Sequence, residues 1–478
     1  MIDINFLFLI LFISKIEVLA DLKHLRAHGH DTSIDLHKKG HSTGACACRK
    51  PRRRRKVLEV VHNPLDVPEL QIIAKRHQPR RWTTASTPFP NMTESTRRRL
   101  KTNICKENHG EANWRRICKS GFLPVTNEEN TTIDHEWWTC EYTQFVASLR
   151  CGFLDSDYRG RTPAMIYDQS RTFPLHACKT PSQQPLTFPP RQIICFNRLA
   201  TAIGVYPTST AHVIVQLPRL VFLLQTLPKD VPILMASSGK MLRQIISFLS
   251  EKGILDPARI VEWDPEASYA AESLYFAGEV ARGTATGGKW NSLGSSENCS
   301  GILGMPRQLL QDLIEKTVSS AVGSIPYGGQ YLRRPIVVIV DRSDAQPRRV
   351  SNHEAMMESL RSAFGHICSL VEFIGEKNSM SATISIFAKA DVVIGPHGAA
   401  LSFVSFMRSQ GPRKALLEIG FTSRESMPFP PSYYMALALS SGASYYMSLA
   451  SGAYNGNLEA DIPDVKRLLH KALNDIKR

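Results

Sequence analysis

The sequence lacks an uninterrupted apolar stretch of the roughly 20 residues that a membrane-spanning helix needs. Its N-terminal apolar run, Ile4 to Ile13, is shorter and contains one polar residue. A run of this length is typical of the apolar region of a signal peptide, and Val18 and Ala20 would form the cleavage site. Asp3 and the absence of an early basic residue are atypical of a cleaved signal peptide, so a short signal anchor stays open as well. We predict that residues 1–20 are one or the other. Either one directs the chain into the secretory pathway.

Zinc-finger and nucleic-acid-binding signatures are also missing. Cys46 and Cys48 lie near His41, but no second pair of ligands follows at the spacing of a zinc site. The basic run from Lys50 to Lys56 fits a nuclear localisation signal, a nucleic-acid patch, a processing site or a solvated stem. No interleaved aromatic residues or RNA-binding motifs accompany it. We therefore favour a stem, and a basic nucleic-acid binder is the least favoured class.

Acidic residues are scarce near the N-terminus. Residues 1–100 contain 19 Lys and Arg against 9 Asp and Glu, which places +10 of the formal net charge of +15 there. Residues 21–101 are rich in His, Pro, Ser, Thr and Arg without a sustained apolar period, and we predict a disordered basic stem. The chain of 478 residues, 43% hydrophobic and 21% charged, otherwise has the composition of a globular protein with two domains.

Cysteines and glycosylation sequons agree with a secretory location. Six of the ten cysteines fall within loop-like sequence: Cys105, Cys118, Cys140, Cys151, Cys178 and Cys195. After an apolar leader, this density predicts disulfides, and the spacing leaves their pairing open. Three Asn-x-Ser/Thr sequons fit a luminal chain: Asn91, Asn130 and Asn298.

Strand and helix patterns alternate from about residue 191 onward. Candidate strands are 193–196, 231–236 and 259–263, and candidate helices are 211–227, broken by Pro218, and 240–252. We predict that residues 102–300 form an N-terminal domain, disulfide-rich and then Rossmann-like. Residues 283–301 are rich in Gly and Asn and fit a loop or linker, and residues 305–322 fit a helix that leads into a second domain.

Residues 301–478 show the clearest pattern. Continuous apolar strands alternate with helical segments and predict a parallel, doubly wound sheet: strands 335–340, 370–375, 391–394 and 415–419; helices 354–364, 381–390, 401–407 and 465–476. Ligands bind beyond the carboxyl ends of such strands. Arg342, Arg349, His397 and Glu418 fall at or just after those ends, so they are candidates to bind a nucleotide diphosphate.

The stretch from Lys389 to Phe406 is the most specific one in the chain. An apolar strand ends at Gly395-Pro396, and His397-Gly398-Ala399 then opens a helix-like segment. Such a turn presents free backbone N–H groups and the positive end of a helix dipole, which suit a phosphate. By itself the motif is equally compatible with an ordinary turn and a loop histidine.

Taken together, these residues resemble glycosyltransferase family 61. The resemblance rests on paired arginines and Asn352 upstream of the strand, on GPHGA from Gly395 to Ala399, and on Glu418-Ile419 downstream, and it is best over residues 336–447. It implies two Rossmann-like domains facing each other across a cleft (GT-B), a UDP-sugar donor as co-substrate, inversion at the anomeric carbon, and no metal or other cofactor. Relatives use xylose, arabinose or N-acetylglucosamine, and a glycan or glycoprotein acceptor in the Golgi or endoplasmic reticulum.

The resemblance also implies site residues. Donor binding falls to residues at the strand ends: Arg342, Arg349, Asn352, Gly395, His397, Gly398, Ala399 and Glu418. His397 would assist the leaving group, Glu418 would hold the ribose hydroxyls, and His212 would orient or deprotonate the acceptor. The alternative for His212 is a buried histidine that takes no part in chemistry.

Two positions depart from the family pattern, and a competing motif is present. The family has an acidic residue where this chain has Gln216, and Asn where it has Phe403. An amide cannot accept a proton as a carboxylate does, so a non-catalytic relative that binds nucleotide-sugar or glycan is the alternative. Asp155-Ser156-Asp157 is the one Asp-x-Asp, a pattern that chelates Mn²⁺ in GT-A transferases, but it recurs by chance.

Overall fold

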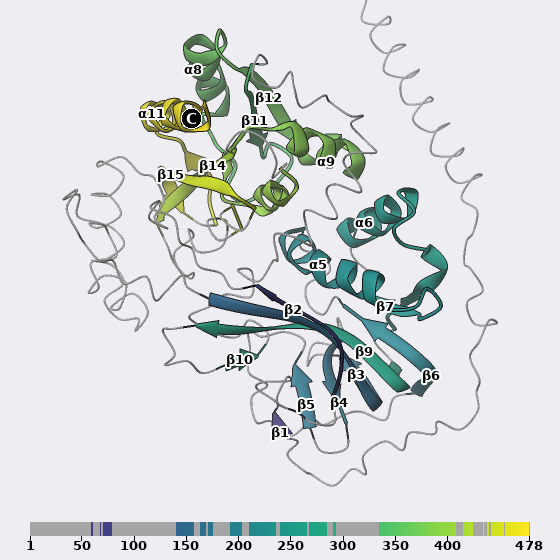
Figure 1. Cartoon of the computed structure of the whole chain (residues 1–478). Coiled ribbons are helices and arrows are strands. Elements are labelled where there is room, and N and C mark those ends of the chain that lie inside the picture. Colours follow the sequence, from purple (N-terminus) through teal and green to yellow (C-terminus); the bar gives the residue numbers. More distant parts are fainter. Residues whose placement is uncertain are drawn as a thin grey trace, which may run out of the picture.

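The structure is a computed structural model. It describes residues 59–60, 67, 70–78, 140–156, 163–168, 171–174, 192–202, 210–235, 240–264, 267–283, 290–292, 334–407, 414–423, 434, 437–438, 441–453 and 455–477. These residues form a mixed α/β fold with two sheets (Figure 1). The leader, the basic run, the three sequons and the helix predicted over 305–322 lie outside the described residues.

The first sheet has ten strands around a long antiparallel pair, β3 (Cys140–Ser156) and β9 (Ala267–Gly283). Beyond β9 the sheet continues in parallel through β6 (Gln192–Thr201), β7 (Ile233–Met235) and β8 (Ile260–Glu262). The crossovers of this parallel part are α5 (Thr210–Thr226) and α6 (Lys240–Glu251), with a 3₁₀ turn η5 (Pro257–Arg259). The other strands are β2 (Gln71–Gln78) and the shorter β1 (Glu59–Val60), β4 (Pro163–Tyr167), β5 (Arg171–Pro174) and β10 (Trp290–Ser292).

The parallel part of this sheet was predicted from the sequence, and its antiparallel part was not. The predicted alternation over residues 193–263 is confirmed by β6, α5, β7, α6 and β8. A simple Rossmann-like sheet is not what forms, because β3 and β9 add a large antiparallel half. Helix α5 also continues through Pro218, where a break was predicted. Buried Leu217, Leu220 and Val221 hold the helix against the core on both sides of that residue.

The prediction of a disordered stem over residues 21–101 is wrong for two segments. Residues 59–60 form β1, and β2 pairs antiparallel with β3 from Gln71↔Ser148 to Gln78↔Tyr142. Leu70 is buried, and Ile72 and Ala74 pack against the core clusters. This short alternation of apolar residues is a strand signal that the surrounding His and Arg obscure.

The second sheet confirms the predicted parallel, doubly wound arrangement. Five parallel strands lie in the order β12-β11-β13-β14-β15, and antiparallel β16 follows at the edge. The strands are β11 (Ile336–Asp341), β12 (Ser369–Ile374), β13 (Val392–Pro396), β14 (Lys414–Ser423), β15 (Ala443–Ala453) and β16 (Leu458–Glu459). The chain reverses its direction of winding between β11 and β13. Ligands of such sheets bind at this switch point, beyond the carboxyl ends of the two strands.

Helices cover both faces of the second sheet. They are α8 (His353–Phe364), η8 (Gly375–Lys377), α9 (Met380–Lys389), the 3₁₀ helix η9 (Ala399–Phe406) and α11 (Ile462–Lys477). Figure 1 shows α8 and α11 side by side on one face, with α9 on the other. The β11 side chains alternate accordingly: Val337 and Ile339 join the core under α8 and α11, whereas Val338 and Val340 join the core under α9.

One hydrophobic cluster joins the two sheets. It contains Leu217 and Leu220 of α5, Phe387 of α9, and Phe403 and Val404 of η9. Contacts between α5 and η9, and between α6 and α9, run through this cluster. The helices of the first sheet are therefore packed directly on those of the second.

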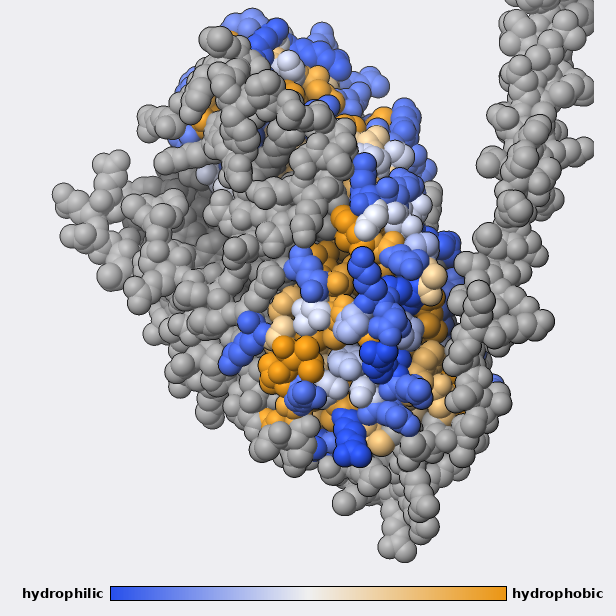
Figure 2. All heavy atoms as spheres, turned by 45° about the vertical axis from the view of Figure 1, so that its right-hand side comes forward, coloured by the Kyte–Doolittle hydropathy of each residue, from blue (hydrophilic) through white to orange (hydrophobic). Residues whose placement is uncertain are grey.

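The described surface carries few large apolar side chains. On the face in Figure 2, polar and apolar residues are interspersed. Among the described residues, Ile73 is the exposed large apolar residue, and 38% of its surface is accessible to solvent. No helix within the described ranges has both the length and the apolar character needed to cross a bilayer.

Candidate functional site at the carboxyl edge of the second sheet

Strand β13 delivers His397 to the switch point. Its residues Val392 to Pro396 are all buried, so the strand is fixed from both faces. A Cβ added to Gly395 would lie 2.8 Å from Val340 Cβ, so only glycine allows β13 to lie this close to β11. The His397 N–H donates to the Ile419 carbonyl at 3.0 Å. The turn that carries His397 is therefore held by backbone contacts.

The His397 ring is fixed by a buried carboxylate. Its Nδ1 lies 2.5 Å from Glu418 Oε1, and the Tyr445 hydroxyl donates to Glu418 Oε2 at 2.6 Å. Because the carboxylate accepts, Nδ1 carries a proton and donates. The rings of Tyr434 and Phe421 meet the imidazole edge to face at 5.0 and 5.6 Å. The His397 ring is thus set in one orientation.

Glu418 is fully buried, and both its oxygens accept from protein side chains. The structure places it beneath His397, and not at the surface where a ribose would meet it. Burial and the neighbouring Glu418 charge raise the pKa of Tyr445 well above its ordinary value. Tyr445 therefore stays a neutral donor to the carboxylate.

Arg342 reaches the same turn from β11. A Cβ on Gly398 would lie 2.3 Å from Arg342 Nη1 and 3.0 Å from its Cζ, so the guanidinium covers the Gly398 backbone. Arg342 Nη2 donates to the Pro347 carbonyl at 3.2 Å, and its buried Nε has no hydrogen-bond partner among the described residues. The end of β11 and the end of β13 thus meet through this contact.

Two guanidinium groups lie near each other at this point. Burial, then the like charge of Arg348, lowers the pKa of Arg342. An anion placed here would relieve the repulsion between them and satisfy guanidinium N–H groups. Arg348 has a left-handed backbone (φ 71°), unusual for a non-glycine residue, and its N–H donates to the Gly456 carbonyl at 2.8 Å. A backbone held in this way is frequent at functional sites.

Two further residues that were predicted to bind the donor are Arg349 and Asn352. Arg349 is exposed, and it is Arg348 whose charge acts on Arg342. Asn352 uses both ends of its amide on the backbone of Ala460, each at 2.9 Å. The amide therefore fastens the start of α8 to the segment before α11. Sequence reasoning missed Arg348 and Tyr434; the adjacency of Arg348 to Arg349 was the available signal for the first.

Phe403 has a packing role. It is 4% exposed and meets Phe387 and Phe406 at ring distances of 5.4 and 6.0 Å. The position that departs from the family pattern is thus part of the cluster between α5 and η9. His212 and Gln216 lie on α5, whose packing on η9 brings that helix to the segment that follows His397.

The other candidate motifs fall elsewhere. Asp155 of the Asp-x-Asp pair is 1% exposed, and its oxygens accept from Tyr167 (2.7 Å) and Ser268 (2.5 Å), so it is a buried structural carboxylate. Cys151 and Cys195 are disulfide-bonded, while the Cys368 thiol is buried and donates to the Phe364 carbonyl.

Metal-ligating side chains converge at a different place. Within the described part of the chain they are Asp341, His353 and Glu372, on the α8 side of the second sheet. None of them belongs to the group around His397.

Comparison with known proteins adds one match. No curated protein matched the chain. The family model described as Glycosyltransferase 61 matches residues 210–411, from the start of α5 to just beyond η9. The matched segment includes Arg342, Arg348 and His397 and ends before Glu418. The similarity to glycosyltransferase family 61 therefore covers residues 210–411.

Proposed function

We propose that the protein transfers a sugar of the xylose, arabinose or N-acetylglucosamine class from a UDP-sugar to a glycan or glycoprotein acceptor. The family match supports a glycosyltransferase that takes a nucleotide-sugar donor and a glycan acceptor. The observation that carries the finer proposal is the meeting of Arg342, Arg348 and His397 at the switch point of the second sheet. Half-buried positive charge at that position suits a diphosphate.

The proposed step is one in-line displacement with inversion. The acceptor hydroxyl attacks the anomeric carbon, the bond from that carbon to the UDP oxygen breaks, and UDP leaves with the electron pair. Negative charge then grows on the diphosphate, where Arg342 and Arg348 would stabilise it. With Glu418 as its counter-ion, a doubly protonated His397 would donate to the same oxygens from Nε2. These groups would neutralise the charge on the leaving diphosphate in place of a metal cation, so the step needs no metal there.

The acceptor would approach from the first sheet. Helix α5 carries His212 and packs on η9, which follows His397 directly. We propose that His212 orients the acceptor hydroxyl and takes its proton. This places acceptor and donor on two α/β units in the GT-B manner, with the acceptor domain N-terminal. A luminal location in the Golgi or endoplasmic reticulum, with membrane contact limited to an N-terminal anchor, completes the proposal.

The direct test is transfer from individual UDP-sugars by the purified protein. Release of UDP with formation of a glycoside of inverted anomeric configuration, seen by NMR, is the expected result. Turnover should not rise when Mn²⁺ or Mg²⁺ is added. Absence of UDP binding, or turnover that depends on an added cation, would contradict the proposal.

His397→Ala tests the role of the histidine. Loss of one preorganised donor to developing charge costs about 10²–10³ in kcat. His366→Ala, which removes an exposed histidine between α8 and β12, is the matched control and should leave turnover unchanged. Equal turnover of the two variants, with equal melting temperatures, would remove His397 from the mechanism.

A non-catalytic relative is the second candidate, and Gln216 is the observation that favours it. Such a protein would bind UDP or UDP-sugar at the same arginines without transfer. Tight UDP binding with no product from any sugar and acceptor pair would select it. Gln216→Glu, which restores the acidic residue of the family pattern, would then create turnover.

A further inference from the structure

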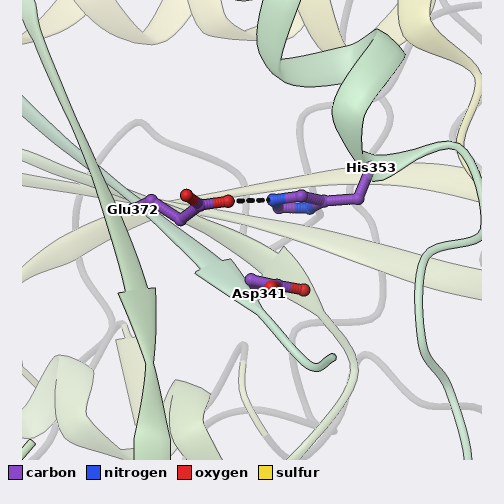
Figure 3. Close-up of side chains that lie close together, drawn as sticks. All are labelled: Asp341, His353 and Glu372. Carbon is purple, nitrogen blue, oxygen red and sulfur yellow. Dashed lines mark hydrogen bonds and ion pairs between the residues drawn. The ribbon is translucent and has the colours of Figure 1, made fainter. Parts of the chain in front are cut away.

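Three potential metal ligands meet on the α8 side of the second sheet. Asp341 ends β11, His353 begins α8 and Glu372 lies on β12, and in Figure 3 the Glu372 carboxylate faces the His353 ring, with Asp341 below the pair. One ligand atom from each residue lies within 4.8 Å of the others. The three elements are neighbours in the fold, although the residues are far apart in the sequence.

His353 has an unsatisfied nitrogen at this point. Its Nε2 lies 2.7 Å from Glu372 Oε1 and, facing a carboxylate, is the nitrogen that donates. Nδ1, the other ring nitrogen, is buried and has no hydrogen-bond partner in the described part of the protein. The residue is 8% exposed. A buried polar atom without a partner lowers the stability of the fold, and a ligand bound to this nitrogen would remove that penalty.

We propose that Asp341, His353 and Glu372 bind one divalent metal ion, zinc or manganese. One imidazole and two carboxylates are a donor set that both ions accept. Around a tetrahedral ion with bonds of about 2.0–2.1 Å, ligand atoms lie roughly 3.4 Å apart. One ligand atom of each residue already lies within 4.8 Å of the others, so side-chain rotations that exchange the hydrogen bond between His353 and Glu372 for bonds to the ion bring the ligand atoms to this spacing. An ion gives the imidazole lone pair a partner and offsets two carboxylate charges.

The site is separate from the proposed diphosphate site. Asp341 continues the row of Val337 and Ile339 toward α8, whereas Arg342 turns to Gly398 at the end of β13. Asp341 also accepts from the Ser343 N–H at 2.9 Å and from its hydroxyl at 2.5 Å, so it already anchors the loop that follows β11. The ion would join that loop to α8 and β12. The proposed ion has a structural role and takes no part in the proposed sugar transfer.

The test is metal binding by the full chain after dialysis against a chelator. Zn²⁺ and Mn²⁺ are titrated separately by calorimetry, and bound metal is counted by elemental analysis. Asp341→Asn and Glu372→Gln keep the side-chain shapes but remove the charges, and each should bind one ion per chain fewer than the unaltered protein. Glu358→Gln, the same charge change on the exposed side of α8, should bind as the unaltered protein does. Bound metal should raise the melting temperature of the unaltered chain and of Glu358→Gln.

Three results would overturn the proposal. The first is that the unaltered chain takes up neither ion. The second is that Asp341→Asn and Glu372→Gln take up as much metal as the unaltered chain. The third is that Glu358→Gln loses as much metal binding as those two variants. If the variants do not fold, zinc X-ray absorption of the unaltered chain decides: oxygen and nitrogen ligands support the site, whereas sulfur ligands place the ion elsewhere. Neither readout depends on sugar transfer, so this proposal and the transferase proposal fail independently.

Discussion

Gly398 lies against Arg342, and the lack of a side chain at this position leaves room for the guanidinium. Its backbone is extended (φ 172°), a conformation open to any residue, so alanine adds no backbone strain. The added Cβ would instead displace the Arg342 guanidinium, 2.3 Å away. Because a hydrogen bond to a charged group contributes about 1.5–3 kcal/mol, we expect Gly398→Ala to weaken UDP binding by about 10- to 100-fold. Calorimetric titration with UDP measures this.

Gly456→Ala is the matched control. Its Cβ would make only ordinary contacts, the nearest at 3.8 Å, on the segment that accepts the Arg348 N–H. UDP affinity should stay the same. If Gly398→Ala also bound UDP normally, the contact between Arg342 and Gly398 would have no part in donor binding.

The buried Tyr445 hydroxyl predicts how stability depends on pH. Its folded-state pKa is raised, so the neutral phenol is favoured in the fold, and its contribution is complete below the unfolded value of about 10 and is lost as pH rises further. Burial raises the pKa of Tyr269 to about 12, and burial beside Asp155 raises that of Tyr167. The free energy of unfolding should therefore fall above about pH 10.

Tyr445→Phe isolates one of these groups. The variant should be about 1–3 kcal/mol less stable at neutral pH, because Glu418 loses a donor. Above pH 10 its slope should be shallower by up to about 1.36 kcal/mol per pH unit, which corresponds to one proton. Urea unfolding at a series of pH values measures both effects. Parallel curves for the variant and the unaltered chain would contradict the assignment.

At the residue scale, the sequence predicted positions better than roles. Arg342, His397 and Glu418 could be located because polar residues at the ends of apolar strands must meet at one edge. That Glu418 lies under His397, and that Arg348 is the nearer arginine, depends on side-chain directions within a loop. The group of Asp341, His353 and Glu372 was missed, because only Asp341 falls at a strand end, whereas His353 begins a helix and Glu372 lies within a strand.

Among the elements, β2 has the most unexpected position. It lies in a basic segment, yet it pairs with the first half of β3, while β4 pairs with the other end of the same edge. Without β2, the backbone of residues 142–148 would be an unpaired strand edge. We expect a chain that begins at residue 81 to lose at least about 2 kcal/mol of stability, from several lost hydrogen bonds.

A chain that begins at residue 57 keeps β1 and β2 and is the control. Thermal unfolding and light scattering compare the two, and the shorter chain should also aggregate. Equal melting temperatures would mean that β2 does not stabilise the sheet.

Elements with a continuous apolar pattern could be predicted, and those without it could not. Strands β11, β13 and β14 are buried on both faces and therefore appear as apolar runs, which in β14 is interrupted by the buried Glu418. Strand β9 is rich in Ala and Ser and carries two glutamates, so its 17 residues give no such run. It forms because β3 and β6 supply hydrogen bonds along both its edges. That pairing is long-range, and local sequence does not encode it.

For the whole molecule, the cluster shared by α5, α9 and η9 predicts that the two sheets unfold together. Phe403 lies in that cluster, and truncation of a buried phenylalanine typically costs 3–5 kcal/mol. All six tryptophans lie at or before Trp290, so their fluorescence reports only on the N-terminal part of the chain. Phe403→Ala should nevertheless lower the fluorescence midpoint in step with circular dichroism. Phe403→Leu leaves a smaller cavity and should recover most of the loss. A fluorescence transition that stays in place while circular dichroism shows an earlier, separate step would mean that the sheets are independent, and that the donor and acceptor sides of the proposed site are not held together by this core.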